Sequence, residues 1–240
     1  MKHQRGVALL LVLWVLALLS ILLAGLAGWV QLENRQALWQ RQHTQALMAA
    51  EAGLSLAVMG LSDPAQRRQW VADGRVQGLS FDTAQLRVSV RSERGKLDLN
   101  AASADDFARL LQGCGAPKAL AQTLSQALDQ RRGNGQAPLR MVEEVRQLPG
   151  LSQPLYRCVE PQVTLWSGLE RPDPGFATRL LKRLLSLPNA TAMGADPGQI
   201  VSVRSVATLP NGAGATLRVT LLLNPSTEGA RPYRVLHWQE

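Results

Sequence analysis

The sequence predicts an α/β protein of the α+β kind, in which a long N-terminal helix precedes an antiparallel sheet and an α-helical domain is inserted into the sheet. Three observations predict this fold. An uncharged apolar run over 7–30 passes into a helical pattern that ends near 62. Residues 85–91 and the last forty residues alternate between apolar and polar side chains, as half-buried strands do. Between these strands lies a block with helical periodicity.

Composition places the chain among globular proteins with a membrane segment. It has 240 residues, of which 46% are hydrophobic, and a chain of this size can form a hydrophobic core without the support of disulfides or metal ions. Its two cysteines exclude a disulfide-rich miniprotein, and the apolar content excludes intrinsic disorder. The net charge is +8, but the arginines are scattered with no basic block of five or more, which disfavours a nucleic-acid partner.

The apolar run is long enough to cross a bilayer. As a helix, 7–30 would extend about 36 Å, against roughly 30 Å of hydrocarbon. A cleaved secretory signal fits less well, because its apolar region is only about 7–15 residues long. Lys2 and Arg5 place the short N-terminus in the cytoplasm by the positive-inside rule, so 31–240 would lie outside, on the other side of the membrane. An ordinary single-pass anchor is the alternative.

The basic leader that ends in Arg5-Gly6 resembles a type IV prepilin leader, here residues 1–6. This resemblance implies that prepilin peptidase cuts after Gly6 and methylates the new amine of Val7. It also implies that 7–30 is the membrane half of one helix that continues to Ser62. Most members of that family carry Glu where this chain has Leu11. Leu11 therefore fits a subunit at the filament tip, with no subunit above it to offer an amine, although drift of a membrane anchor would also give Leu.

The rest of the chain is expected to alternate between sheet and helices. Residues 65–84 are polar and predicted as a loop, and 96–100 are expected to return as a strand after 85–91. Ser103 begins a helix through Leu111 as a capping-box variant. The other expected helices are 117–132, 141–148 and 174–186, and the other expected strands are 162–166, 200–209, 216–223 and 233–238.

Several short motifs are similar to general secretion pathway protein K, a minor pseudopilin of type II secretion. These are 51–54 (EAGL), 96–103 (KLDLNAAS), 148–150 (LPG), 163–167 (VTLWS) and 233–238 (YRVLHW), and they cover nearly the whole chain. The resemblance implies a pilin-like domain formed by 31–95 and 191–240, with 96–190 as the inserted helical domain. One element departs from the family pattern, at 171–175 (RPDPG).

No enzyme site emerges from the sequence. The histidines are isolated at His3, His43 and His237, so neither a triad nor a histidine metal site is expected. Some relatives bind calcium, but no Asp-x-Asp-x-Asp loop is present, no ligand is named and no cofactor is expected.

Two features of the helical block leave alternatives open. Gly113-Cys114-Gly115 with Lys118 and Ala119 resembles one helix-hairpin-helix turn that could hold a DNA phosphate, but a tight structural turn is favoured. Cys114 and Cys158 could form a disulfide in an oxidising periplasm, or remain two buried thiols.

These features together predict a protein that works by assembly. The resemblance implies a tip complex with the I and J minor pseudopilins, and contacts with other pseudopilins, with prepilin peptidase and with inner-membrane lipid. That complex would initiate a pseudopilus that promotes export of folded proteins across the outer membrane. The alternatives are a minor pilin of a type IV pilus or competence system with an adhesive or DNA-capturing tip, and a membrane-anchored DNA-binding protein.

Overall fold

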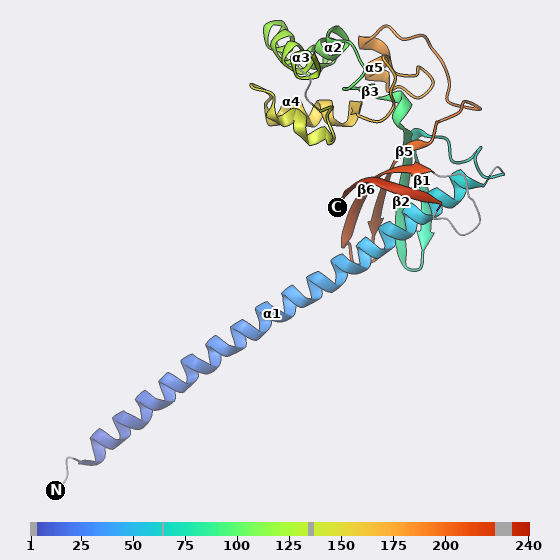
Figure 1. Ribbon diagram of the computed structural model, residues 1–240. Coiled ribbons are helices and arrows are strands. Elements are labelled where there is room, and N and C mark those ends of the chain that lie inside the picture. The colour runs from blue at the N-terminus through green and yellow to red at the C-terminus, as the bar shows by residue number, and fades with distance from the viewer. Residues whose placement is uncertain (1–3, 64, 134–136, 224–231) are drawn as a thin grey trace.

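One uninterrupted helix dominates the molecule (Figure 1). The computed structural model describes residues 4–63, 65–133, 137–223 and 232–240, without the side chains of 4–9 and 26–28. Helix α1, Gln4–Ser62, has 59 residues and so extends about 88 Å. It ends at Ser62, as the sequence predicts, and the backbone amide of Asp63 still donates to the carbonyl oxygen of Met59 (3.0 Å).

A five-stranded antiparallel sheet packs against the C-terminal half of α1. The strands are ordered β1-β2-β5-β6-β7, and the expected meander of the last three is confirmed. β2 and β5 are neighbours, with Ser92 opposite Val201, although the helical domain separates them in sequence. The strand bounds are β1 Asp73–Phe81, β2 Ala84–Ser92, β5 Ile200–Thr208, β6 Gly214–Leu223 and β7 Tyr233–Gln239.

The first core lies between α1 and one face of this sheet. Small residues on α1 let the helix approach the strands closely: Ala46, Ala50 and Ala57 are fully buried. The nearest approach is at Gly53, where an added Cβ would lie 2.3 Å from the Ser205 side-chain oxygen on β5. The strands contribute alternate buried side chains to this core, including Val88, Val203 and Val219.

The helical domain has a core of its own, around Phe107, Leu110, Leu124 and Leu181. Figure 1 shows this domain at the end of the molecule that is distant from the N-terminus. A two-stranded parallel sheet, β3 with β4, joins its entry to its later part. Its elements are η1 Glu93–Gly95, β3 Leu97–Asp98, α2 Ala104–Gly113, α3 Lys118–Gly133, η2 Val142–Gln147, α4 Gln153–Val159, η3 Glu160–Gln162, β4 Val163–Thr164 and α5 Arg179–Leu184.

Two expectations about strands were wrong. The predicted loop over 65–84 contains β1, whose Asp73, Gly74 and Gly78 are residue types that strands seldom contain; pairing with β2 at the sheet edge overrides that preference. The strand expected over 96–100 is only Leu97–Asp98 and does not pair with β2, because η1 directs the chain away from the sheet and β5 occupies that place.

The helices of the inserted domain differ from expectation in length and type. The expected helix over 174–186 is shortened to α5, because the Thr178 hydroxyl accepts from the amide of Leu181 (3.3 Å) and so caps the helix there. The segment 141–148 is the 3-10 helix η2, and the sequence pattern did not reveal α4. Ser103 does begin α2, where its hydroxyl accepts from the amide of Asp106 (3.1 Å).

The close approach at Gly53 leads to a testable prediction. Gly53→Ala should lower the free energy of unfolding by about 1 kcal/mol, because a helix gain of about 1 kcal/mol is outweighed by about 1–3 kcal/mol of overpacking against Ser205. In a Ser205→Ala background the oxygen is gone and the nearest atom is Val88 Cγ2 at 3.0 Å, so the same change should cost clearly less. Thermal unfolding of the full chain in maltoside micelles measures the effect of Gly53→Ala in each background. Equal effects in the two backgrounds would show that the Ser205 side chain does not limit the approach of α1 at Gly53.

Candidate assembly surface

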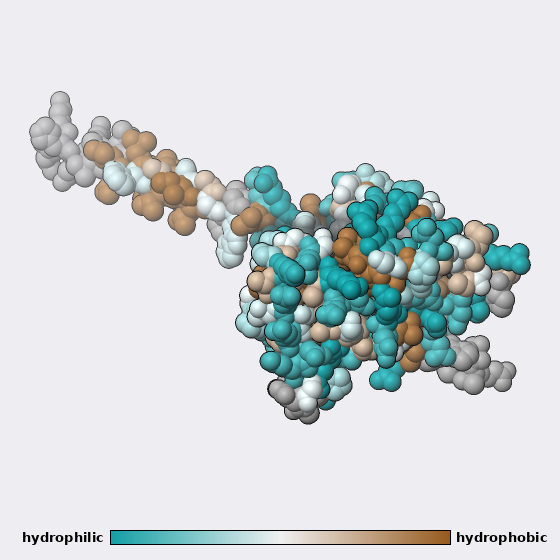
Figure 2. All heavy atoms as spheres, turned by 90° about the horizontal axis from the view of Figure 1, so that it is seen from above, coloured by the Kyte–Doolittle hydropathy of each residue, from teal (hydrophilic) through white to brown (hydrophobic). Residues whose placement is uncertain are grey.

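The N-terminal half of α1 is an apolar surface that the rest of the chain does not cover. Its large side chains between Leu10 and Leu23 are all exposed, and Leu11 is 62% exposed. Figure 2 shows this half as a rod with a mostly hydrophobic surface, whereas the folded part is mostly hydrophilic. In the part of the chain that the structure describes, α1 alone is long and apolar enough to cross a membrane.

The polar side chain within this apolar run is satisfied inside the helix. The Ser20 hydroxyl donates to the carbonyl oxygen of Leu16 (2.8 Å). A hydroxyl with such an internal partner can lie in hydrocarbon without the cost of an unpaired polar group. Gly6 and Val7 lie in the first turns of α1, but their side chains fall outside the described residues, as does His3.

The middle of α1 exposes a second set of large apolar side chains. Trp29, Leu32, Leu38 and Trp39 are each more than half exposed. The Trp39 ring stacks on the His43 imidazole, with ring centroids 5.1 Å apart. Ala46 is the first described residue of α1 that is fully buried, after the partly buried Gln42 and His43. The exposed surface of α1 therefore continues from the membrane-length segment to the edge of the sheet.

A buried aspartate organises the entry to the helical domain. Asp98 is 1% exposed, and one of its carboxylate oxygens accepts from the Ser167 hydroxyl (3.1 Å) and the Gly168 amide (2.7 Å). Its other oxygen accepts from the amide of Asn100 (2.9 Å). Two of the sequence motifs, 96–103 and 163–167, are thus held together here, a role that sequence reasoning missed because the partners are about 70 residues apart.

Asn100 and Arg132 fix the neighbouring backbone. The Asn100 side chain donates to the carbonyl oxygen of Leu139 and accepts from its amide, both at 3.0 Å. The Arg132 guanidinium donates to the carbonyl oxygen of Ala102 (2.6 Å). These contacts join Leu139 and the end of α3 to the chain before α2.

A disulfide between Cys114 and Cys158 links the α2–α3 turn to α4, with Cα atoms 5.8 Å apart. Gly115, beside it, has φ +95°, a conformation that requires glycine for structural reasons alone. Lys118 and Ala119 begin α3 on the exposed surface. The bonded cysteines connect the two ends of the helical block.

Among the described residues, no group of three or more His, Cys, Asp or Glu side chains lies close enough together to hold a metal ion. His43 lies on α1, and His237 on β7 contacts Glu143, with Nε2 3.2 Å from the carboxylate oxygen. The buried Glu93 carboxylate is paired with the Lys96 amine (2.6 Å).

The hydrogen bonds of the Glu144 carboxylate shift its pKa. Glu144 accepts from the backbone amides of Arg140 (2.8 Å) and Met141 (2.9 Å), and it also pairs with the Arg131 guanidinium. The two backbone hydrogen bonds first, and the Arg131 partner after them, lower the pKa of Glu144 below its usual value.

The fold of this chain resembles one in a solved structure. The chain is similar to a chain in the crystal structure of the GspK-GspI-GspJ complex from the enterotoxigenic Escherichia coli type 2 secretion system, with a TM-score of 0.59. The likeness covers 83% of this chain and 97% of that chain, at 15% sequence identity. No protein-family model matches the sequence, and no curated protein matches it. The expected α+β, pilin-like architecture is thus confirmed as a fold.

The position of Glu144 predicts a pH-dependent contribution to stability. Because its pKa is lowered in the folded state, its contribution is present above its unfolded pKa of about 4.3 and is lost as the pH falls through the folded value. Glu144→Gln should therefore cost about 0.5–1 kcal/mol at neutral pH and nothing in strong acid.

Thermal unfolding of the full chain across this pH range measures the difference. Glu170→Gln, at an exposed carboxylate with no ion pair among the described residues, is the matched control and should change stability little at any pH. A cost for Glu144→Gln that is the same in acid and at neutral pH would contradict the assignment.

Proposed function

We propose that this protein is a minor pseudopilin of a type II secretion system. In this proposal it is held in the inner membrane with its folded part in the periplasm. It assembles with I and J minor pseudopilins at the tip of the pseudopilus, so that folded proteins are exported across the outer membrane. The protein acts by assembling rather than by catalysing a reaction. The fold likeness to a component of the GspK-GspI-GspJ complex supports this proposal.

The exposed half of α1 supplies the means of assembly. Its apolar side chains can face lipid before assembly and equivalent helices afterwards, because both surroundings are apolar. The exposed Leu32, Leu38 and Trp39 lie beyond the membrane-length run, where water would otherwise surround them. Packing beside neighbouring subunits would remove this surface from water, with about 25 cal/mol gained per Å² of apolar area.

The position of the helical domain is the observation that carries the tip assignment. It lies at the end of the molecule away from the apolar N-terminal half of α1 (Figure 1). When α1 stands in the membrane, this domain occupies the space above the sheet, where the next subunit of a filament would continue. Such a subunit can begin a filament that grows from the membrane below it, and its own upper end stays uncovered.

Leu11 supports the same position. It is a fully apolar residue in the membrane-length run, where the related subunits of a shaft would present a carboxylate to a neighbour's amine. A carboxylate without a partner costs about 2.5–3.5 kcal/mol at the centre of a membrane helix. A tip subunit has no neighbour above it, so leucine is the better residue at this place.

Processing provides one test. We expect the mature chain to begin at Val7 with an N-methylated amine, because Gly6 offers prepilin peptidase a residue without a side chain at the cut. Intact-mass spectrometry of protein from peptidase-positive cells measures this. Gly6→Leu should block cleavage, whereas Gly25→Leu within the same apolar run should not. A chain that starts near residue 28–31, or that keeps Met1, would refute the prepilin assignment.

Assembly provides the decisive test. In a strain that lacks the native copy, Leu11→Ile should support secretion and co-purify with the I and J pseudopilins. Leu11→Glu should be neutral or impaired, because its carboxyl group would have no amine to pair with. Failure of the native chain to co-purify with I and J would overturn the proposed function. Improved assembly of Leu11→Glu, with the protein found along the shaft, would overturn the tip position alone.

A further inference from the structure

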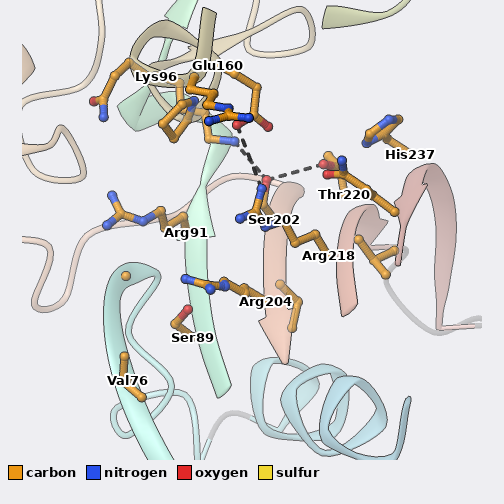
Figure 3. Close-up of a pocket in the computed structure, with 17 residues that line it drawn as sticks. Val76, Ser89, Arg91, Lys96, Glu160, Ser202, Arg204, Arg218, Thr220 and His237 are labelled. Carbon is orange, nitrogen blue, oxygen red and sulfur yellow. Dashed lines mark hydrogen bonds and ion pairs between the residues drawn. The ribbon is translucent and has the colours of Figure 1, made fainter. Parts of the chain in front are cut away.

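A groove of about 440 Å³ lies between the sheet and the helical domain, on the sheet face opposite to α1. Its floor is the outward face of the strands, from Val76 on β1 to His237 on β7. Its roof is Arg157 of α4 with the 160–162 segment of η3. Figure 3 shows Arg204, Arg218 and Ser202 on the floor, with Glu160 and Lys96 above them.

The charges that line this groove are nearly all positive. Its lining includes the side chains of Arg91, Lys96, Arg157, Arg204 and Arg218, and a single carboxylate, that of Glu160. The arginines are scattered along the sequence, but the fold brings four of them, with Lys96, to this one groove, whose net charge is positive.

Part of this positive charge is not neutralised within the chain, although the Lys96 amine is paired with Glu93 (2.6 Å). Arg218 lies 3.9 Å from Glu160, at the limit of an ion pair. None of the ion pairs among the described residues involves Arg91 or Arg204. Asp73, which is opposite Arg91 in the strand register, is instead held by Arg75 (2.8 Å).

Two of the arginines oppose each other directly. Arg204 on β5 is the cross-strand partner of Arg218 on β6, and like charges in this arrangement repel. The hydroxyls of Ser202 and Thr220, in the adjacent row, are 3.3 Å apart and add polar groups to the floor. An anion placed over this floor would relieve the repulsion and accept hydrogen bonds from both guanidinium groups.

We propose that this groove binds an extended acidic segment of a protein partner, with its carboxylates over Arg91, Arg204 and Arg218. The five strands span about 19 Å at a spacing of about 4.8 Å, which matches roughly six residues of extended chain. The roof formed by α4 and η3 excludes a flat bilayer surface and a nucleic-acid duplex, whereas a single peptide chain can enter. This inference does not depend on the proposed secretion role.

The test uses the full chain in maltoside micelles and a fluorescein-labelled peptide. The peptide has about ten residues, with glutamate alternating with serine so that its carboxylates share one side of the extended chain. We expect saturable binding by fluorescence anisotropy that weakens as salt screens the charges. The same peptide with glutamine in place of glutamate should not bind. Equal binding of both peptides would refute the proposal.

Matched variants locate the binding. Arg91→Gln with Arg204→Gln should weaken it roughly tenfold or more, because each lost charge-assisted contact is worth a large part of a tenfold factor. Arg87→Gln is the control: Arg87 is exposed on the same face of β2 but does not line the groove, so affinity should change by less than about twofold. Glu160→Gln removes the one lining carboxylate and should tighten binding, a gain that unfolding could not produce.

Three other probes separate the acidic peptide from other anions. Inorganic phosphate, phosphatidylglycerol vesicles and a single-stranded oligonucleotide should each bind more weakly than the peptide. Tighter binding of any of them that depends on Arg91 and Arg204 would overturn the choice of partner. If Arg87→Gln lowered the affinity for the peptide as much as the double variant does, the attraction would come from the general positive charge of the sheet face and not from the groove.

Discussion

The packing of α1 on the sheet is the constraint on which the rest of the molecule depends. Ala46, Ala50, Gly53 and Ala57 bring the helix axis close to the strands, so the last turns of α1 belong to the soluble core. Among the residues before Ala46 whose side chains the structure describes, none is buried by its own chain. A continuous helix transmits its direction along its whole length, so the packing on the sheet also sets the direction of the apolar half relative to the folded part. The proposed role gives this half its contacts, in lipid and in other helices.

The elements with a strong period could be predicted from sequence. The long helix with its end at Ser62, the strand around Val88 and the C-terminal meander all follow from apolar spacing and turn residues. The two wrong strand predictions have a common cause, because contacts with distant parts of the chain determined the structure of both segments. β1 is a strand because β2 pairs with it, despite Gly74 and Gly78, and 96–100 lost its expected partner to β5. Local sequence carries no information on which distant strand will occupy a place.

The apolar half of α1 and the basic groove also differ in how far the sequence could predict them. The apolar half of α1 is contiguous in sequence, so its exposure could be anticipated from the absence of charges between 7 and 30. The basic groove could not be, because Arg91 and Arg204 are separated by more than a hundred residues and meet only through the pairing of β2 with β5. The same holds for Asp98, whose partners at 167 and 168 come from beyond five intervening helical elements. Alternation within each strand predicted only that these arginines would face away from the core.

The insertion point of the helical domain has a consequence for how such chains can diversify. The segment leaves the sheet after Ser92 and returns at Val201, which are cross-strand partners. Its two ends are therefore about 5 Å apart, as in an ordinary hairpin. A short turn would close the same gap without altering the register of β2 and β5. The pairing of β2 with β5 therefore sets no length for the segment between them, and chains that keep this sheet could differ in what they carry at this place.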